Sequence, residues 1–171
     1  TILSGNNPFP PVEVTVTYTD PSNNTSDCIA RVTVKDTIPP SITCADPAPV
    51  NNTPGLCEAF VAPPVPSTGD NCLIKTLTND YTGLPSAAAT YPVGTTQVTW
   101  TIFDKAGNYT DCVVDVVVID NEDPNAICKD ITVQLDATGS ASITAAELDN
   151  GSNDNCPGFA LTLNDYDFDC S

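Results

Sequence analysis

The feature that most constrains the fold is an internal repeat, because a shift of 84 positions superimposes the chain on itself without an insertion. The shift places Asp20 on Asp104 and Cys28 on Cys112, and further along it places Cys44 on Cys128. Other matched positions are Asn24 and Asn108, Asp27 and Asp111, Asp36 and Asp120, Pro40 and Pro124, Gly55 and Gly139, and the triplets Asp70-Asn71-Cys72 and Asp154-Asn155-Cys156. Self-similarity at a fixed period indicates serial copies of one structural module.

The repeat divides the sequence into three segments, and neither end segment is expected to close a core by itself. Residues 1–35 are predicted to be the C-terminal hairpin of a truncated repeat, residues 36–119 a complete repeat, and residues 120–171 the N-terminal part of a third. We therefore expect a section of a longer array, whose partners are neighbouring copies of the same repeat. A second interpretation is a subunit whose two ends complete each other between neighbouring molecules.

Each repeat is predicted to end in a β-hairpin. Residues 96–102 and 112–119 alternate at period two on either side of a Gly-containing turn, and residues 14–18 and 28–34 form the earlier copy. Trp100 is the predicted centre of the core, and Val98 and Ile102 are expected on the same face of the strand, because alternate residues of a strand point the same way. Shorter strands are expected at 41–44, 57–61, 74–78, 131–135, 141–143, 161–163 and 166–170. Only residues 145–148 look helical, so the predicted class is all-β, built from sandwich modules.

The charge and composition of the chain argue against several classes of function. With 22 acidic and 5 basic residues the net charge is −17, which argues against nucleic acid as a partner. No apolar run approaches the roughly 20 residues of a membrane-spanning helix, so we expect no membrane insertion. The sequence contains no histidine, which removes Ser-His-Asp and Cys-His arrangements and the usual zinc ligands. We predict that the chain is not an enzyme.

The eight cysteines indicate an oxidising compartment. No Cys-x-x-Cys motif is present, so a metal site is a weak alternative to disulfide bonds. We expect a secreted or cell-surface, extracellular protein.

Five motifs carry a resemblance to a known family. They are Asp-x-x-x-Pro-x-x-x-Cys at 36–44, Gly-x-Cys-x-Ala at 55–59, Asp-Asn-Cys at 70–72, Pro-Val-Gly-Thr-Thr-x-Val-Thr-Trp at 92–100 and Asp-x-Ala-Gly-Asn-x-x-x-Cys at 104–112. Together they resemble the hyalin repeat (HYR) domain over 36–119 and, for the hairpin only, over 1–35. The resemblance implies tandem immunoglobulin-like β-sandwich modules, a role in adhesion or surface structure, and no catalytic activity.

The third segment departs from this pattern. Ala141 replaces the cysteine of Gly-x-Cys, and Cys170 is new. This variant resembles repeats in very large secreted surface adhesins of Bacteroidetes-type bacteria.

The two module types suggest a disulfide pairing. They share three cysteine positions, and the fourth lies at Cys57 in one type and Cys170 in the other. The alternation of side chains along the strands places Cys57 and Cys112 on inward faces, so we predict the disulfide Cys57–Cys112. The remaining predicted disulfides are Cys44–Cys72 and Cys128–Cys156. Cys28 and Cys170 would then pair outside this sequence. The alternative is Cys44–Cys112 with Cys57–Cys72.

Calcium is the one cofactor for which the sequence offers candidate ligands. In an immunoglobulin-like sandwich, the start of the first strand, the loop after the second strand and the turn of the closing hairpin gather at one end. That end carries Asp36, Asp70, Asn71 and Asp104 in the middle module, and its counterpart carries Asp120, Glu122, Asp123, Asp154 and Asn155. Such carboxylates and amides suit hard cations, and the joint at 120–124 is similar to the calcium-binding linkers of cadherin-type arrays. Alternatively, these residues only form turns.

The predicted function is mechanical, with the repeats acting as a stalk or spacer of a surface adhesin or filament. The alternative is an adhesive module that binds polysaccharide or a protein partner, for which Tyr81, Tyr91 and Tyr109 are candidate contacts. Thr37, in Asp36-Thr37-Ile38, resembles an O-glycosylation signal of Bacteroidetes.

Overall fold

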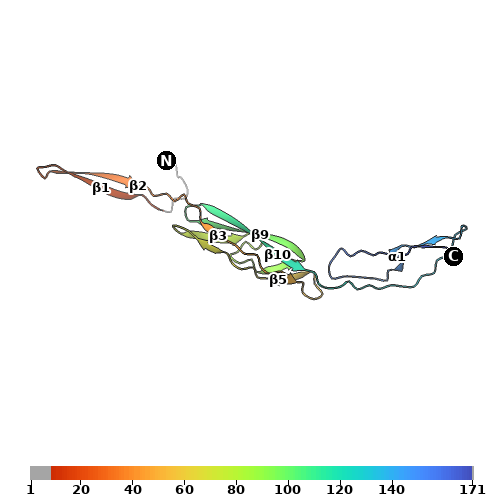
Figure 1. Cartoon of the computed structure of the whole chain (residues 1–171). Coiled ribbons are helices and arrows are strands. Elements are labelled where there is room, and N and C mark those ends of the chain that lie inside the picture. The colour runs from red at the N-terminus through yellow and green to blue at the C-terminus, as the bar shows by residue number, and fades with distance from the viewer. Residues whose placement is uncertain (1–8, 171) are drawn as a thin grey trace. The chain divides into compact units, whose positions relative to one another are not determined.

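The computed structural model describes residues 9–170 and is all-β with disulfide bonds, which confirms the predicted fold class. Figure 1 shows the chain as strands with almost no helix. The elements are β1 (Val12–Thr19), β2 (Thr25–Val32), β3 (Ser41–Thr43), β4 (Val50–Asn51), β5 (Glu58–Val61), β6 (Ser67–Gly69), β7 (Ile74–Asn79), β8 (Ala89–Pro92), β9 (Gly94–Asp104), β10 (Tyr109–Ile119), β11 (Ala141–Ser142), α1 (Ala145–Leu148) and β12 (Asp167–Phe168).

The chain divides into two compact units, which do not coincide with the three predicted segments. Unit 1 contains the chain up to Pro47 together with Ala62–Ala89 and Gln97–Val116. Unit 2 contains Ala48–Val61, Thr90–Thr96 and the chain from Val117 onward. The boundaries predicted at 35/36 and 119/120 stay predictions, and residues 1–8 of the first segment lie outside the described residues.

In unit 1, β1 and β2 form the predicted antiparallel hairpin, with Val12 opposite Val32 and Thr19 opposite Thr25. All of the residues of both strands are exposed. Opposite charges face each other across the pair, where Arg31 Nη2 lies 3.0 Å from Glu13 Oε1. Contacts between exposed charges add little stability, so the hairpin depends mainly on its ladder and its turn.

The hairpin turns repeat at the level of single hydrogen bonds. Asp20 accepts the Asn24 amide at 2.8 Å and the Asn24 side-chain NH2 at 2.8 Å. Asp104 accepts the same two donors from Asn108, at 2.8 and 2.6 Å. These bonds, with the side-chain bond of Asn24 as the largest cause, hold the pKa of Asp20 below its ordinary value. The 84-residue repeat of the sequence is therefore also a repeat of turn geometry.

The predicted core residues are buried as expected. Val98, Trp100 and Ile102 alternate along β9 and are fully buried. The same alternation in β10 buries Val114 and Val116. In unit 1, β9 lies between β10 and β7, and β7 is antiparallel to β9 with Leu77 opposite Ile102. The parity of the sequence therefore identified the inner face of this sheet correctly.

Short strands complete the two units. In unit 1, β3 pairs antiparallel with β6. In unit 2, the end of β10 pairs in parallel with β4, with Val118 opposite Val50, and β5 pairs with β8. β4 and β6 are not among the strands expected from the sequence, because strands of two or three residues carry too little periodicity to recognise.

The third segment forms fewer strands than predicted. β11 and β12 pair through Ala141 and Phe168, but the strands expected at 131–135 and 161–163 do not form. Val133 and Leu135 are 41% and 42% exposed. Their alternation is that of a strand, but among the described residues no neighbouring strand takes their backbone hydrogen bonds, and a ladder needs two strands. Within residues 9–170, no helix is long and apolar enough to span a membrane.

Candidate functional site

The first disulfide joins Cys44 to Cys112 in unit 1, with their Cα atoms 6.2 Å apart. This was the alternative pairing for Cys44, and the preferred pairs Cys57–Cys112 and Cys44–Cys72 are wrong. Cys112 lies near the start of β10, where Thr110 Oγ1 donates a hydrogen bond to the Pro40 carbonyl at 2.6 Å. That contact brings the start of β10 beside the segment that leads into β3 and Cys44.

The second disulfide joins Cys57 to Cys156 across 99 positions of sequence, with their Cα atoms 4.9 Å apart in unit 2. The predicted pair Cys128–Cys156 is therefore also wrong. Ala59 and Val61 are buried, so the inward parity assigned to Cys57 is correct. However, parity says which face a side chain occupies and not where along the sheet its partner lies. Cys57 follows β4, which pairs with the last residues of β10, far along that strand from Cys112.

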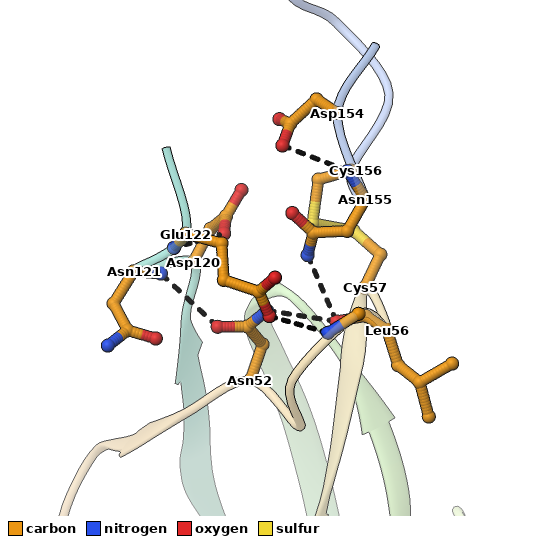
Figure 2. Close-up of a disulfide and its surroundings, with 10 residues drawn as sticks. Asn52, Leu56, Cys57, Asp120, Asn121, Glu122, Asp154, Asn155 and Cys156 are labelled. Atoms are coloured by element: carbon orange, nitrogen blue, oxygen red, sulfur yellow. Dashed lines mark hydrogen bonds between the residues drawn. A yellow bond between two sulfur atoms is a disulfide. The ribbon is translucent and has the colours of Figure 1, made fainter. Parts of the chain in front are cut away.

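Polar contacts surround the second disulfide, as Figure 2 shows. Glu122 Oε1 accepts hydrogen bonds from Asn52 Nδ2 at 3.0 Å and from the Gly55 amide at 2.7 Å. Asn155, next to Cys156, donates from Nδ2 to the Leu56 carbonyl at 3.1 Å. The turn that precedes Cys57 is therefore held both by a side chain of the 120–124 joint and by the loop of the third segment.

The second set of predicted calcium ligands is used for these turns. Asp120 Oδ1 accepts the Glu122 amide at 3.2 Å, and Asp154 Oδ1 accepts the Asn155 amide at 2.9 Å. In the part of the chain that the structure describes, Asp120, Glu122, Asp123 and Asp154 do not belong to a group of carboxylates close enough to share an ion. For this set the structure supports the alternative reading, in which acidic residues form turns.

The first set is brought together in unit 1. One carboxylate oxygen from each of Asp36, Asp70 and Asp104 lies within 4.8 Å of the others. Asn71, the fourth predicted residue, donates from Nδ2 to Asp36 Oδ1 at 3.2 Å. Hydrogen bonds from the Ile38 amide and from Asn71 hold the pKa of the Asp36 carboxyl below its ordinary value. The predicted gathering of the joint, the loop and the hairpin turn is therefore present in this unit.

Four cysteines within residues 9–170 carry free thiols: Cys28, Cys72, Cys128 and Cys170. Cys72 follows Asp70 and Asn71. Loss of solvation, followed by the hydrogen bond and negative charge of Asp36, raises the pKa of the Cys72 thiol. The other two acids of the cluster, Asp70 and Asp104, act in the same direction.

This arrangement predicts the order of thiol reactivity. At neutral pH, iodoacetamide is expected to modify the four free cysteines and to react most slowly with Cys72, because the thiolate is the reactive form. Timed alkylation of the folded, unreduced chain followed by peptide mass spectrometry measures the rates. Labelling of Cys44 or Cys57, or fastest reaction at Cys72, would contradict the pairing and the thiol environment described above.

The remaining candidate residues lie at separate places. Thr37 is exposed, as a modification site requires, and its glycosylation stays a prediction. Tyr91 is fully buried, so its prediction as a contact for a polysaccharide or protein partner is wrong. Tyr109 is exposed, and its ring centroid lies 5.5 Å from that of Phe103. Tyr91 was misassigned because the residues before it lack periodicity, which hid the inward position of Tyr91 in β8.

Comparisons with known proteins agree with the motif analysis. Residues 35–118 match the family model of the HYR domain. The chain is 29% identical over 138 residues to hyalin of Lytechinus variegatus, an alignment that covers 76% of this chain. It spans about a quarter of the length of that curated relative, 25%. No solved structure matches the chain with statistical significance. The comparisons confirm, for the middle of the chain, the resemblance to the HYR domain that its motifs predicted.

Proposed function

We propose that this chain is a non-catalytic, tension-bearing segment of an extracellular adhesion-type protein, acting as a stalk or spacer. The observation that carries the proposal is the Cys57–Cys156 disulfide, which connects positions 99 apart in the sequence. The Cys44–Cys112 bridge closes one loop, and the Cys57–Cys156 bridge starts inside that loop and ends outside it.

The Cys57–Cys156 bridge shortens the covalent path along which force travels. A pull between Cys44 and Cys156 follows the backbone from Cys44 to Cys57 and then crosses the sulfur bridge to Cys156. Cys44 and Cys57 are 13 positions apart, so extension stops after roughly 45 Å at about 3.5 Å per residue. Most of the intervening chain carries no load, even if its hydrogen bonds break.

Noncovalent contacts support the same role. Glu122 and Asn155 both form hydrogen bonds with the turn before Cys57, and Asn155 is the neighbour of Cys156 at the other end of the bridge. Disulfide bonds form and persist in oxidising compartments such as the extracellular space, which agrees with the proposed location. The match to the HYR domain and the similarity to hyalin support an adhesion-related module. The Bacteroidetes-type surface adhesins that the third segment resembles are the proposed setting, with neighbouring repeats as the partners.

Stretching single molecules by atomic force microscopy tests the proposal. The oxidised chain is expected to extend by no more than roughly 45 Å between Cys44 and Cys156. Replacing Cys57 and Cys156 by serine moves the limit to the path from Cys112 to Cys156, which is 44 positions and roughly 150 Å. After full reduction the limit is the whole 112 positions, roughly 390 Å.

The matched control is serine at both Cys44 and Cys112. That variant also loses one disulfide, but the short path through Cys57–Cys156 remains, so the limit should not change. A longer extension in this control, or an unchanged limit when Cys57 and Cys156 are replaced, would refute a load path through the second bridge.

A further inference from the structure

The cluster formed by Asp36, Asp70 and Asp104 brings three carboxylates together and leaves a buried oxygen of Asp36 and one of Asp70 without a hydrogen-bond donor. Asp36 comes from the joint after β2, Asp70 from the loop after β6, and Asp104 from the end of β9. Asp36 is 7% exposed and Asp104 is fully buried. Within residues 9–170 this is the group of acidic, cysteine or histidine side chains that lies close enough to share an ion.

Two of the three carboxylates present a buried oxygen without a donor. Asp36 Oδ1 accepts from the Ile38 amide and from Asn71, whereas its buried Oδ2 has no hydrogen-bond partner. Asp70 Oδ2 accepts the Cys72 amide at 3.0 Å, whereas its buried Oδ1 has none. In each case one oxygen holds the side chain in place, and the other has no donor at hydrogen-bond geometry. The Cys72 thiol, a weak donor, also interacts with the Asp36 carboxyl. Buried oxygens of this kind are costly unless they are paired.

The charge of the cluster is not balanced by the protein. Three carboxylates at this separation repel one another, and like charges this close are stable only when one takes a proton or a cation binds. Among the described residues, the ion pair present is Arg31–Glu13, which includes no residue of the cluster. Lys35, next to Asp36 in sequence, is exposed. Lys105, next to Asp104 in sequence, is exposed.

We propose that Asp36, Asp70 and Asp104 bind one Ca2+ ion, with Asp36 Oδ2 and Asp70 Oδ1 as direct ligands. One carboxylate oxygen of each residue lies within 4.8 Å of the others, so all three residues can reach a single Ca2+, which takes oxygen ligands at about 2.3–2.6 Å. Mg2+ demands a stricter octahedron at about 2.0–2.1 Å and gives up its water reluctantly, so it is less suited to carboxylates that come from three separate segments. The ion links the joint, the loop and the hairpin turn of one unit.

The proposal is independent of the stalk function, because the ligands belong to unit 1 and the Cys57–Cys156 bridge belongs to unit 2. Ca2+ would remain bound in a chain that carried no load. Conversely, the short covalent path through Cys57 would remain in a chain that bound no ion.

Thermal unfolding of the whole chain with Ca2+ and with the chelator EDTA tests the site. Ca2+ at a hundredfold excess over its Kd is expected to raise the midpoint by about 5–10 °C. Calorimetric titration with CaCl2 should give one strong site. In Asp70→Asn the amide oxygen still accepts the Cys72 amide, so the fold is kept. Without calcium this variant should melt at the same temperature as the parent or higher, because repulsion is reduced, but it should lose the response to Ca2+.

The matched control is Asp111→Asn, which removes the same charge from an exposed residue of the same unit and should keep the full response. Three results would overturn the proposal: no shift between Ca2+ and EDTA, an equal shift with Mg2+ or with NaCl of the same ionic strength, or an equal loss in Asp111→Asn. The second would show only screening of the −17 charge of the chain.

Discussion

Serine substitution of both Cys57 and Cys156 is expected to lower the unfolding free energy by about 4–5 kcal/mol. The bridge spans 99 positions, and closing a loop of that length restricts the unfolded chain by roughly this amount. Since whole domains have stabilities of about 5–15 kcal/mol, the loss is a large fraction of the total. Urea unfolding followed through the fluorescence of Trp100, the single tryptophan of the chain, measures it.

The control for this change is serine at both Cys72 and Cys128. These exposed thiols form no disulfide, so the double substitution alters two cysteines without opening a loop, and we expect a change within about 0.5 kcal/mol. An equal loss in the two double variants would mean that the serines themselves, or a different pairing of cysteines, account for the effect.

Trp100→Ala is expected to cost about 3–5 kcal/mol, the usual range for removing a large aromatic side chain from a core. Trp100 is fully buried on β9, between the equally buried Val98 and Ile102. Its Nε1 has no hydrogen-bond partner among the described residues, so its contribution is one of packing. Urea unfolding followed by circular dichroism gives the free energy, because the variant has no tryptophan fluorescence.

Phe60→Ala is the matched control for the tryptophan. Phe60 is also aromatic and lies in a strand, but it is 67% exposed, whereas its neighbours Ala59 and Val61 are buried. We expect a change within about 0.5 kcal/mol. If Phe60→Ala were as costly as Trp100→Ala, the inward and outward faces assigned to these strands would be wrong.

Much of the fold could be predicted because its information is local. Period-two alternation identified both long hairpins, and it identified Val98, Trp100 and Ile102 as the buried face. The repeat also predicted that the Asp104–Asn108 turn would copy the Asp20–Asn24 turn. These features depend on residues close in sequence, whose backbone geometry leaves few alternatives.

The third segment shows the limit of local patterns. Residues 131–135 alternate as a strand should, but they remain without a ladder in the described structure. A strand is stable only beside another strand, and no pattern within five residues says whether a partner is present.

The sequence by itself determined the all-β class, the repeat, the resemblance to the HYR domain and the set of acidic residues near Asp36. Only the tertiary structure decided which cysteines pair, since Cys57 meets a cysteine 99 positions away. It also separated Asp36, Asp70 and Asp104, which converge, from Glu122 and Asp154, which serve turns. The physical reason is the same in both cases: disulfides and ion sites require atoms within a few ångströms of each other, and parity or spacing specifies only a direction.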